Sequence, residues 1–209
     1  KQSYSTGSVV GDDYVGGLVG RNYGTVRESY STGSVAGDDD IGGLVGGNRH
    51  GTVTQSYSTG SVLGTGNSSV GGLVGWNEDG TVTQSYSTGS VSGSSYVGGL
   101  VGKNYGSGAT ITQSYSTGVV SGSGGSIGGL VGYNEEGTIT QSYSTDSVSG
   151  SGDYIGGLVG DNYSGTITES YWDINTSGQS TSAGGEGKTT AEMKQQATFV
   201  DWDFTNVWG

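Results

Sequence analysis

The stretch TVTQSYSTGSV, from Thr52 to Val62, decides the fold because the chain repeats it. The same letters return at Thr81 to Val91, and TITQSYSTGVV follows at Thr110 to Val120. The tyrosine of this stretch recurs every 26 to 29 residues, at Tyr4, Tyr30, Tyr57, Tyr86, Tyr115, Tyr143 and Tyr171. Self-similarity at a nearly fixed period is the sequence signature of repeat architectures. The sequence therefore predicts an array of about six repeats.

Composition alone would favour disorder, and it also argues against collagen, a membrane-spanning protein and a nucleic-acid-binding protein. The chain has 209 residues, 46 of them glycine, with no proline or cysteine and a formal charge of -12. Leu, Ile, Val and Phe total only 38, which is typical of disordered chains, but the repetition argues for a fold. The glycines lack the three-residue period of collagen, and no apolar run approaches the roughly 20 residues that cross a bilayer. Because like charges repel, the acidic balance argues against a nucleic-acid partner.

The spacing within each repeat predicts short strands separated by bends. Val53 and Tyr57 are an even number of positions apart, so an extended chain would point both inward and would point Thr52, Thr54, Ser56 and Ser58 outward. The odd step from Tyr57 to Val62 calls for a bend, which we place at Thr59-Gly60, and a second bend is expected at Gly71-Gly72. Residues 1–171 are therefore predicted to form an all-β parallel β-solenoid of about six coils, with roughly three strands per coil.

Four columns of repeated side chains are expected to be structural. Two are apolar ladders of the core: Val26, Val53, Val82, Ile111, Ile139, Ile167 and Leu18, Leu44, Leu73, Leu100, Leu130, Leu158. The third is a ladder of side-chain amides that can hydrogen-bond from coil to coil: Asn22, Asn48, Asn77, Asn104, Asn134 and Asn162. The fourth consists of Gln55, Gln84, Gln113 and Gln141, and the glutamates Glu28 and Glu169 in the same column suggest that it lies near a wet corner.

The blocks GGLVG.N and GTVTQSYSTGSV resemble the GLUG repeat over essentially the whole chain. That repeat occurs in large secreted or surface-attached bacterial and archaeal proteins, including adhesin-like proteins and regions beside immunoglobulin-A-cleaving metallopeptidases. The resemblance implies a solenoid in an extracellular setting and no defined activity. Metallopeptidase chemistry does not carry over, because the chain has no H-E-x-x-H motif and a single histidine.

The last segment, residues 172–209, is predicted to be an aromatic-rich cap. It concentrates Trp172, Trp202, Trp208, Phe199, Phe204 and Met193. Thr189 and Glu192 have the spacing of a capping box, which predicts a short helix from Thr190 to Ala197. Such a cap would cover the apolar core and unpaired strand edges at the end of the array. At the other end the chain begins in the middle of a repeat, so we expect further repeats or domains in a parent protein.

Catalysis is not expected, and a bound calcium ion is left open. His50 lies in the variable loop NRHGT, where a solvated role is the simpler interpretation. Glycoside hydrolysis needs two carboxylates at a fixed separation, whereas most carboxylates here lie in loops of changing length. No cofactor is predicted, although calcium could be held where two neighbouring loops bring five carboxylates together. These candidate ligands are Asp12, Asp13, Asp38, Asp39 and Asp40.

The functional prediction is a non-catalytic structural and adhesive module of a secreted or cell-surface protein, without membrane insertion and with an unresolved surface ligand such as ice, a glycan or a cell-surface component. An ice-binding protein is the first alternative, because outward Thr-x-Thr rows are expected on a flat, uncharged face. Its residues are Thr52, Thr54, Thr81, Thr83, Thr110, Thr112, Thr138, Thr140, Thr166 and Thr168. A carbohydrate-binding module is the second alternative. It rests on Trp76 and on the tyrosines outside the SY repeat: Tyr14, Tyr23, Tyr96, Tyr105, Tyr133, Tyr154 and Tyr163.

Overall fold

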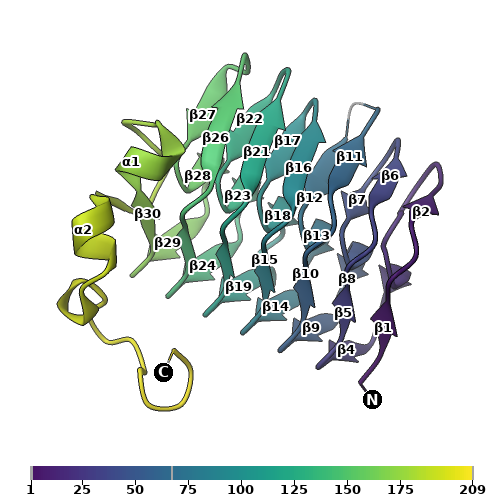
Figure 1. Cartoon of the computed structure of the whole chain (residues 1–209), viewed down its shortest axis with the longest axis horizontal. Helices are drawn as coiled ribbons and strands as arrows, with labels where there is room; N and C mark the ends of the chain where they lie inside the picture. The colour runs from purple at the N-terminus through teal and green to yellow at the C-terminus, as the bar shows by residue number, and fades with distance from the viewer. Residues whose placement is uncertain (1, 67, 209) are drawn as a thin grey trace.

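The structure is a computed structural model that describes residues 2–66 and 68–208, and it is a parallel β-solenoid of about six turns. Figure 1 shows the coils side by side, from the N-terminal coil in purple to the last coil in green, with both α-helices beyond the last coil. A complete coil contains five short strands, compared with the roughly three predicted, because each predicted side is interrupted where the chain bends. Corresponding strands of successive coils pair in parallel and form five sheets.

Two sheets hold the repeated stretch that opens the sequence. The tyrosine sheet contains β1 (Tyr4–Ser5), β5 (Tyr30–Ser31), β10 (Tyr57–Ser58), β15 (Tyr86–Ser87), β20 (Tyr115–Ser116), β25 (Tyr143–Ser144), β30 (Tyr171–Asp173) and β31 (Glu186–Lys188). The threonine sheet contains β4 (Thr25–Arg27), β9 (Thr52–Thr54), β14 (Thr81–Thr83), β19 (Thr110–Thr112), β24 (Thr138–Thr140) and β29 (Thr166–Thr168).

Three further sheets complete each coil. The serine sheet contains β2 (Val9–Val10), β6 (Val35–Gly37), β11 (Val62–Gly64), β16 (Ser90–Gly93), β21 (Val119–Gly122) and β26 (Ser147–Gly150). The glycine-corner sheet contains β7 (Ile41–Gly42), β12 (Ser69–Gly71), β17 (Tyr96–Gly98), β22 (Ser126–Gly128) and β27 (Tyr154–Gly156). The asparagine sheet contains β3 (Val19–Asn22), β8 (Val45–Arg49), β13 (Val74–Glu78), β18 (Val101–Tyr105), β23 (Val131–Glu135) and β28 (Val159–Tyr163).

The direction of the tyrosines was predicted wrongly. Ser56 and Ser58 are buried, whereas Tyr57 is half-buried and faces outward between them. The cause is Gln55, whose φ of 50° places it in the left-handed region and reverses which side of the chain faces the core. The change of side therefore occurs at Gln55, before the tyrosine strand, and not at the Thr59-Gly60 bend.

Both predicted apolar ladders are present in the core. From Leu44 to Leu158 the leucine column is fully buried, and from Val53 to Ile139 so is the column of β-branched residues. A single coil buries only a few apolar side chains, so the core exists only because the coils stack. Wherever a coil turns at a glycine pair, a side chain has no room. A Cβ at Gly72 would meet the Gly99 carbonyl oxygen and the Ser87 hydroxyl.

The predicted asparagine ladder is also present and is fully hydrogen-bonded along its length. Each Asn side-chain amide donates to the side-chain oxygen of the next Asn at 2.7 Å, from Asn22 through Asn162. At the bend that follows, Asn77 Nδ2 also donates to the Gly80 carbonyl at 2.9 Å. The ladder therefore satisfies buried polar atoms at one corner of every coil.

The C-terminal segment has two distinct parts. In the first, Trp172 is buried against the last coil, and Ser182 accepts hydrogen bonds from the backbone of Leu158 and Val159. This part contains α1 (Ile174–Ser177) and covers the open end of the core. The second part contains α2 (Thr190–Met193) and the 3-10 helix η1 (Gln196–Thr198). The capping box of Thr189 and Glu192 is confirmed, but its α-helix ends at Met193, earlier than the predicted Ala197.

Candidate functional site

The threonine sheet presents two straight columns of threonine, as the sequence predicted. Thr52, Thr81 and Thr110 are register partners in one column, and the other column runs beside it. Within the columns, hydroxyls of successive coils hydrogen-bond to each other: Thr110 Oγ1 donates to Thr81 Oγ1 at 3.2 Å and Thr112 Oγ1 to Thr83 Oγ1 at 2.9 Å. Eleven of the twelve outward positions on this sheet are threonine, and Arg27 is the exception. The result is a regular, nearly uncharged surface.

The outward tyrosines form a second regular surface. Their rings stack from Tyr4 to Tyr143 with centroids 4.9 to 5.3 Å apart and planes within 11° of parallel. Because the rings face one another, each presents its edge and hydroxyl to the outside. At the neighbouring corner the glutamines form their own ladder, with Gln84 Nε2 3.3 Å from Gln113 Oε1. The prediction of a corner ladder of glutamines is confirmed.

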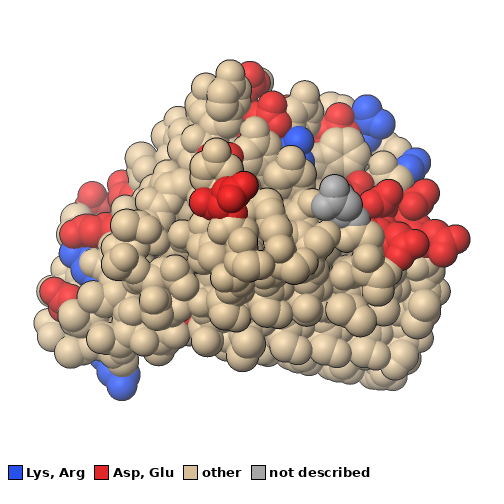
Figure 2. Space-filling view, turned by 90° about the horizontal axis from the view of Figure 1, so that it is seen from above, with Lys and Arg blue, Asp and Glu red and all other residues tan. Residues whose placement is uncertain are grey.

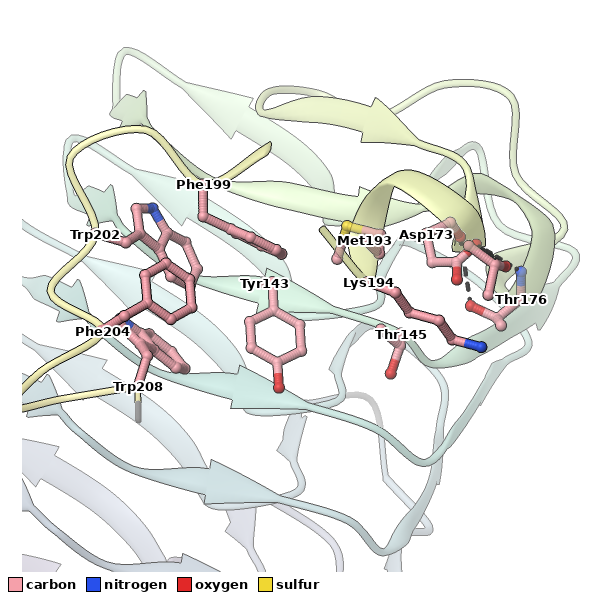
Figure 3. A pocket seen from close by; sticks show the side chains of 11 residues that line it. Tyr143, Thr145, Asp173, Thr176, Met193, Lys194, Phe199, Trp202, Phe204 and Trp208 are labelled. Atoms are coloured by element: carbon pink, nitrogen blue, oxygen red, sulfur yellow. Dashed lines mark hydrogen bonds between the residues drawn. The ribbon is translucent and has the colours of Figure 1, made fainter. Parts of the chain in front are cut away.

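A cleft of about 460 Å³ lies where the C-terminal tail folds back over the tyrosine sheet. Figure 3 shows Trp202, Phe204 and Trp208 gathered on one side of Tyr143, with Met193 and Lys194 on the other. Burial raises the pKa of Tyr143, which keeps its hydroxyl neutral. The sequence predicted the aromatic cap but not this return along the tyrosine sheet.

The tail is anchored to the sheet by hydrogen bonds as well as by rings. Trp202 Nε1 donates to the Glu169 carbonyl at 3.1 Å, and Gln141 Nε2 donates to the Asp201 carbonyl at 2.9 Å. On the polar side of the cleft, the Asp173 carboxylate accepts from the backbone of α1 and is used as its N-cap. The cleft is therefore lined by aromatic rings on one side and by polar side chains, including Asp173 and Lys194, on the other.

Most of the aromatic and charged side chains that vary from coil to coil lie on the glycine-corner and asparagine sheets. Figure 2 shows charged side chains at the top of the view and at its left and right ends, and a wide area almost without them in the lower part. Among them, Lys103 lies over the rings of Tyr96, Tyr105 and Tyr133, at 5.7, 4.6 and 5.2 Å from their centroids. These contacts bring together three of the tyrosines that the sequence proposed for carbohydrate binding.

The candidate calcium ligands occupy two neighbouring loops, and among the described residues their side chains have other partners or none in common. Asp13 and Asp39 are bridge partners, Asp38 accepts a hydrogen bond from the Thr65 hydroxyl, and the Asp40 backbone N–H donates to Ser68 at 2.7 Å. Over residues 2–66 and 68–208, no group of three or more histidine, cysteine or acidic side chains is placed to hold a metal. Desolvation raises the pKa of Asp40 above its usual value. His50 is exposed at a corner, with a φ of 51°.

One buried carboxyl group was not singled out from the sequence. Asp146 occupies a position that is glycine in all five preceding copies of the repeat, and it is only 1% exposed. Burial raises the pKa of its carboxyl group to about 6. Its oxygens accept from the Gly118 backbone N–H at 2.5 Å and from the Ser144 hydroxyl at 2.9 Å. The signal was present in the letters STD, which replace STG in this coil alone.

Comparison with known proteins gives one family and one fold. The GLUG motif matches residues 11–36, 39–63, 66–92, 93–121 and 123–149, which together make up more than half of the chain. No curated protein matches the sequence. A crystal structure described as that of a "putative immunoglobulin A1 protease" from Bacteroides ovatus has a TM-score of 0.73 and 20% sequence identity, covering 97% of this chain and 70% of that one. At this identity the likeness shows the fold alone. Of the described residues, none forms a helix long and apolar enough to cross a membrane.

Proposed function

Since the chain belongs to the GLUG-motif family, we propose that it is a non-catalytic repeat module, serving as a structural and adhesive segment of a larger secreted or cell-surface protein. The observation that supports this proposal most is the regularity of the outward columns. Threonine, tyrosine and small uncharged side chains recur in register over six coils, so that any weak contact they make is repeated at each coil.

The surroundings of the titratable groups agree with a role without catalysis. The Asp173 carboxylate is occupied by N-cap hydrogen bonds, and that of Asp146 by the Gly118 N–H and the Ser144 hydroxyl. The Arg49 and Glu78 side chains form an ion pair at 2.7 Å. A catalytic acid or base needs free access to a substrate, whereas Asp173 caps α1 and the contacts of Asp146 and of Arg49 with Glu78 join neighbouring coils.

Antibodies raised against this chain test the location on the cells that produce the parent protein. We expect them to label intact cells or the medium, and protease added outside the cells to remove the label. A cytoplasmic protein of the same cells serves as the control that must stay unlabelled. Labelling that requires permeabilised cells would refute the extracellular part of the proposal.

Ice binding is the second candidate, and the register of the threonine columns favours it. Methyl and hydroxyl groups repeat about 6.7 Å apart along a strand and about 4.8 Å apart between coils, on a sheet with a single charged outward residue, Arg27. If the face orders water, ice crystals grown in a dilute solution of the chain will be shaped. Thr110→Tyr should abolish the shaping, whereas Ser92→Tyr on the serine sheet should not. Round, freely growing crystals with the unmodified chain would exclude this candidate.

A further inference from the structure

The register of the six coils aligns equivalent residues, and three adjacent columns combine variation from coil to coil with many aromatic and charged side chains. These are the outward positions of the glycine-corner strands and the two outward positions of the asparagine strands, which we call the variable strip. The columns are Tyr14, Asp40, Ser69, Tyr96, Ser126, Tyr154; then Arg21, Gly47, Trp76, Lys103, Tyr133, Asp161; then Tyr23, Arg49, Glu78, Tyr105, Glu135, Tyr163.

Folding does not explain the composition of the variable strip. Of its 18 positions, 15 are aromatic or charged, and the second column has six different residues in six coils. The strip holds every tyrosine outside the tyrosine sheet, together with Trp76. On the threonine sheet, where folding needs only a polar strand residue, the outward side chains hardly change. The fold tolerates any side chain at these positions, yet most of them are aromatic or charged residues, which indicates that the strip binds a ligand.

Four rings of the strip lie against cations, namely Tyr14, Tyr96, Tyr105 and Tyr133, and two ion pairs join charged residues of the strip. The Arg21 guanidinium lies 3.5 Å from the centroid of the Tyr14 ring, and Lys103 lies over Tyr96. Lys103 also pairs with Glu135 at 3.2 Å. Rings fixed in this way lose little conformational entropy when a ligand stacks on them. The strip is thus a preorganised aromatic surface with little net charge of its own.

A groove of about 330 Å³ runs along the first column of the strip and its adjoining loop. It extends from Tyr14 in the first coil to Tyr96 in the fourth, a distance of about 14 Å at one coil spacing of about 4.8 Å. Between the two rings it is lined by the remaining five side chains: Asp13, Asp39, Asp40, Ser68 and Ser69. Asp13 and Asp39 are exposed, so their carboxylates can accept hydrogen bonds from a ligand.

We propose that this groove binds a neutral oligosaccharide, with sugar rings on Tyr14 and Tyr96 and sugar hydroxyls donating to the carboxylates between them. The charges favour a neutral ligand, because the carboxylates in the middle repel polyanions and the Arg21 guanidinium over the Tyr14 ring repels polycations. The size favours a short, linear ligand, since a protein partner typically buries about 800 Å² on each side. This inference rests on the proposed adhesive function and assigns its ligand class.

The test is binding of the whole chain to a panel of immobilised neutral glycans, with heparin and poly-lysine on the same panel. We expect binding to at least one neutral glycan and to neither charged polymer. Tyr96→Ser should weaken that binding about tenfold. Serine is the native residue of this column at Ser69 and Ser126, so the variant should keep the fold, which its circular dichroism and melting temperature verify.

The matched control is Tyr154→Ser, in the same column but two coils beyond Tyr96 and outside the groove. It should bind as tightly as the unmodified chain. The proposal is overturned if no neutral glycan binds, if Tyr96→Ser and Tyr154→Ser weaken binding equally, or if only heparin, poly-lysine or a purified protein binds. Labelling of intact cells by antibodies can succeed in each of these cases, so failure here is distinguishable from failure of the proposed function.

Discussion

Replacing Asn77 by alanine is the sharpest test of the asparagine ladder. Asn77 is fully buried, accepts a hydrogen bond from Asn48 at 2.7 Å, and donates to Asn104 at 2.7 Å and to the Gly80 carbonyl at 2.9 Å. Each bond contributes about 1 kcal/mol, and each buried group left without a partner costs about 1 to 3 kcal/mol. We therefore expect Asn77→Ala to lower the free energy of unfolding by about 3 to 5 kcal/mol.

The assay is denaturant unfolding followed by circular dichroism, with Asn162→Ala as the matched control. Asn162 ends the ladder and is partly exposed, so water can replace its bonds to Asn134 and Gly165, and the loss should be about 1 to 2 kcal/mol. Asn77→Ala and Asn104→Ala share one bond, so their combined effect should be less than the sum. Equal losses at Asn77 and Asn162, or a loss below about 1 kcal/mol at Asn77, would refute the ladder as a stabilising element.

Three further predictions concern a carboxyl group, a glycine corner and the tail. Because burial raises the pKa of Asp146 from 3.8 to about 6, the folded state favours the protonated carboxyl group. The free energy of unfolding should therefore fall by up to about 3 kcal/mol as the pH rises from about 4 to about 6. Asp146→Asn should remove this pH dependence, and an unchanged pH profile of the variant would show that Asp146 does not cause it. Gly72→Ala should destabilise the chain by more than about 3 kcal/mol, because its Cβ would meet the Gly99 carbonyl oxygen and the Ser87 side chain. Gly7→Ala, whose Cβ would meet nothing within 4 Å, should be neutral in the same unfolding assay. Trp202→Ala should release the tail, seen as rapid proteolysis after residue 198 with an intact solenoid; a tail that stays protected would show that the Trp202 contacts do not hold it.

The sequence predicted the solenoid, its apolar ladders and the asparagine column because a repeat shows which positions must stay constant. The missed feature was the side of Tyr57. Val53 and Tyr57 are an even number of residues apart, as in one strand. Gln55 between them has a left-handed backbone, which changes the side that Tyr57 faces without changing this spacing. Glycine corners are the usual place for a bend, so Thr59-Gly60 was preferred. The signal lay in Glu28 and Glu169, since a charged side chain in the same column as Gln55 cannot face a dry core.

The functional surfaces were predictable to different degrees. The threonine columns follow from the alternation of a strand, so their outward direction was evident at Thr52 and Thr54. The cleft over Tyr143 was not, because it forms between residues far apart in the sequence, and no spacing shows where a tail returns. The sequence proposed the tyrosines of the variable strip for carbohydrate binding, but only the register of the coils placed Tyr96 beside Lys103 and Tyr133.

Adhesion under flow measures whether this module attaches the parent protein through its outward columns. Cells that make the parent protein are compared with cells from which this segment has been removed in frame, and with cells carrying the neutral change Gly7→Ala as the control. We expect cells without the segment to detach at lower shear, and the control cells to behave as the unmodified ones. Equal resistance to shear with and without the segment would contradict this expectation.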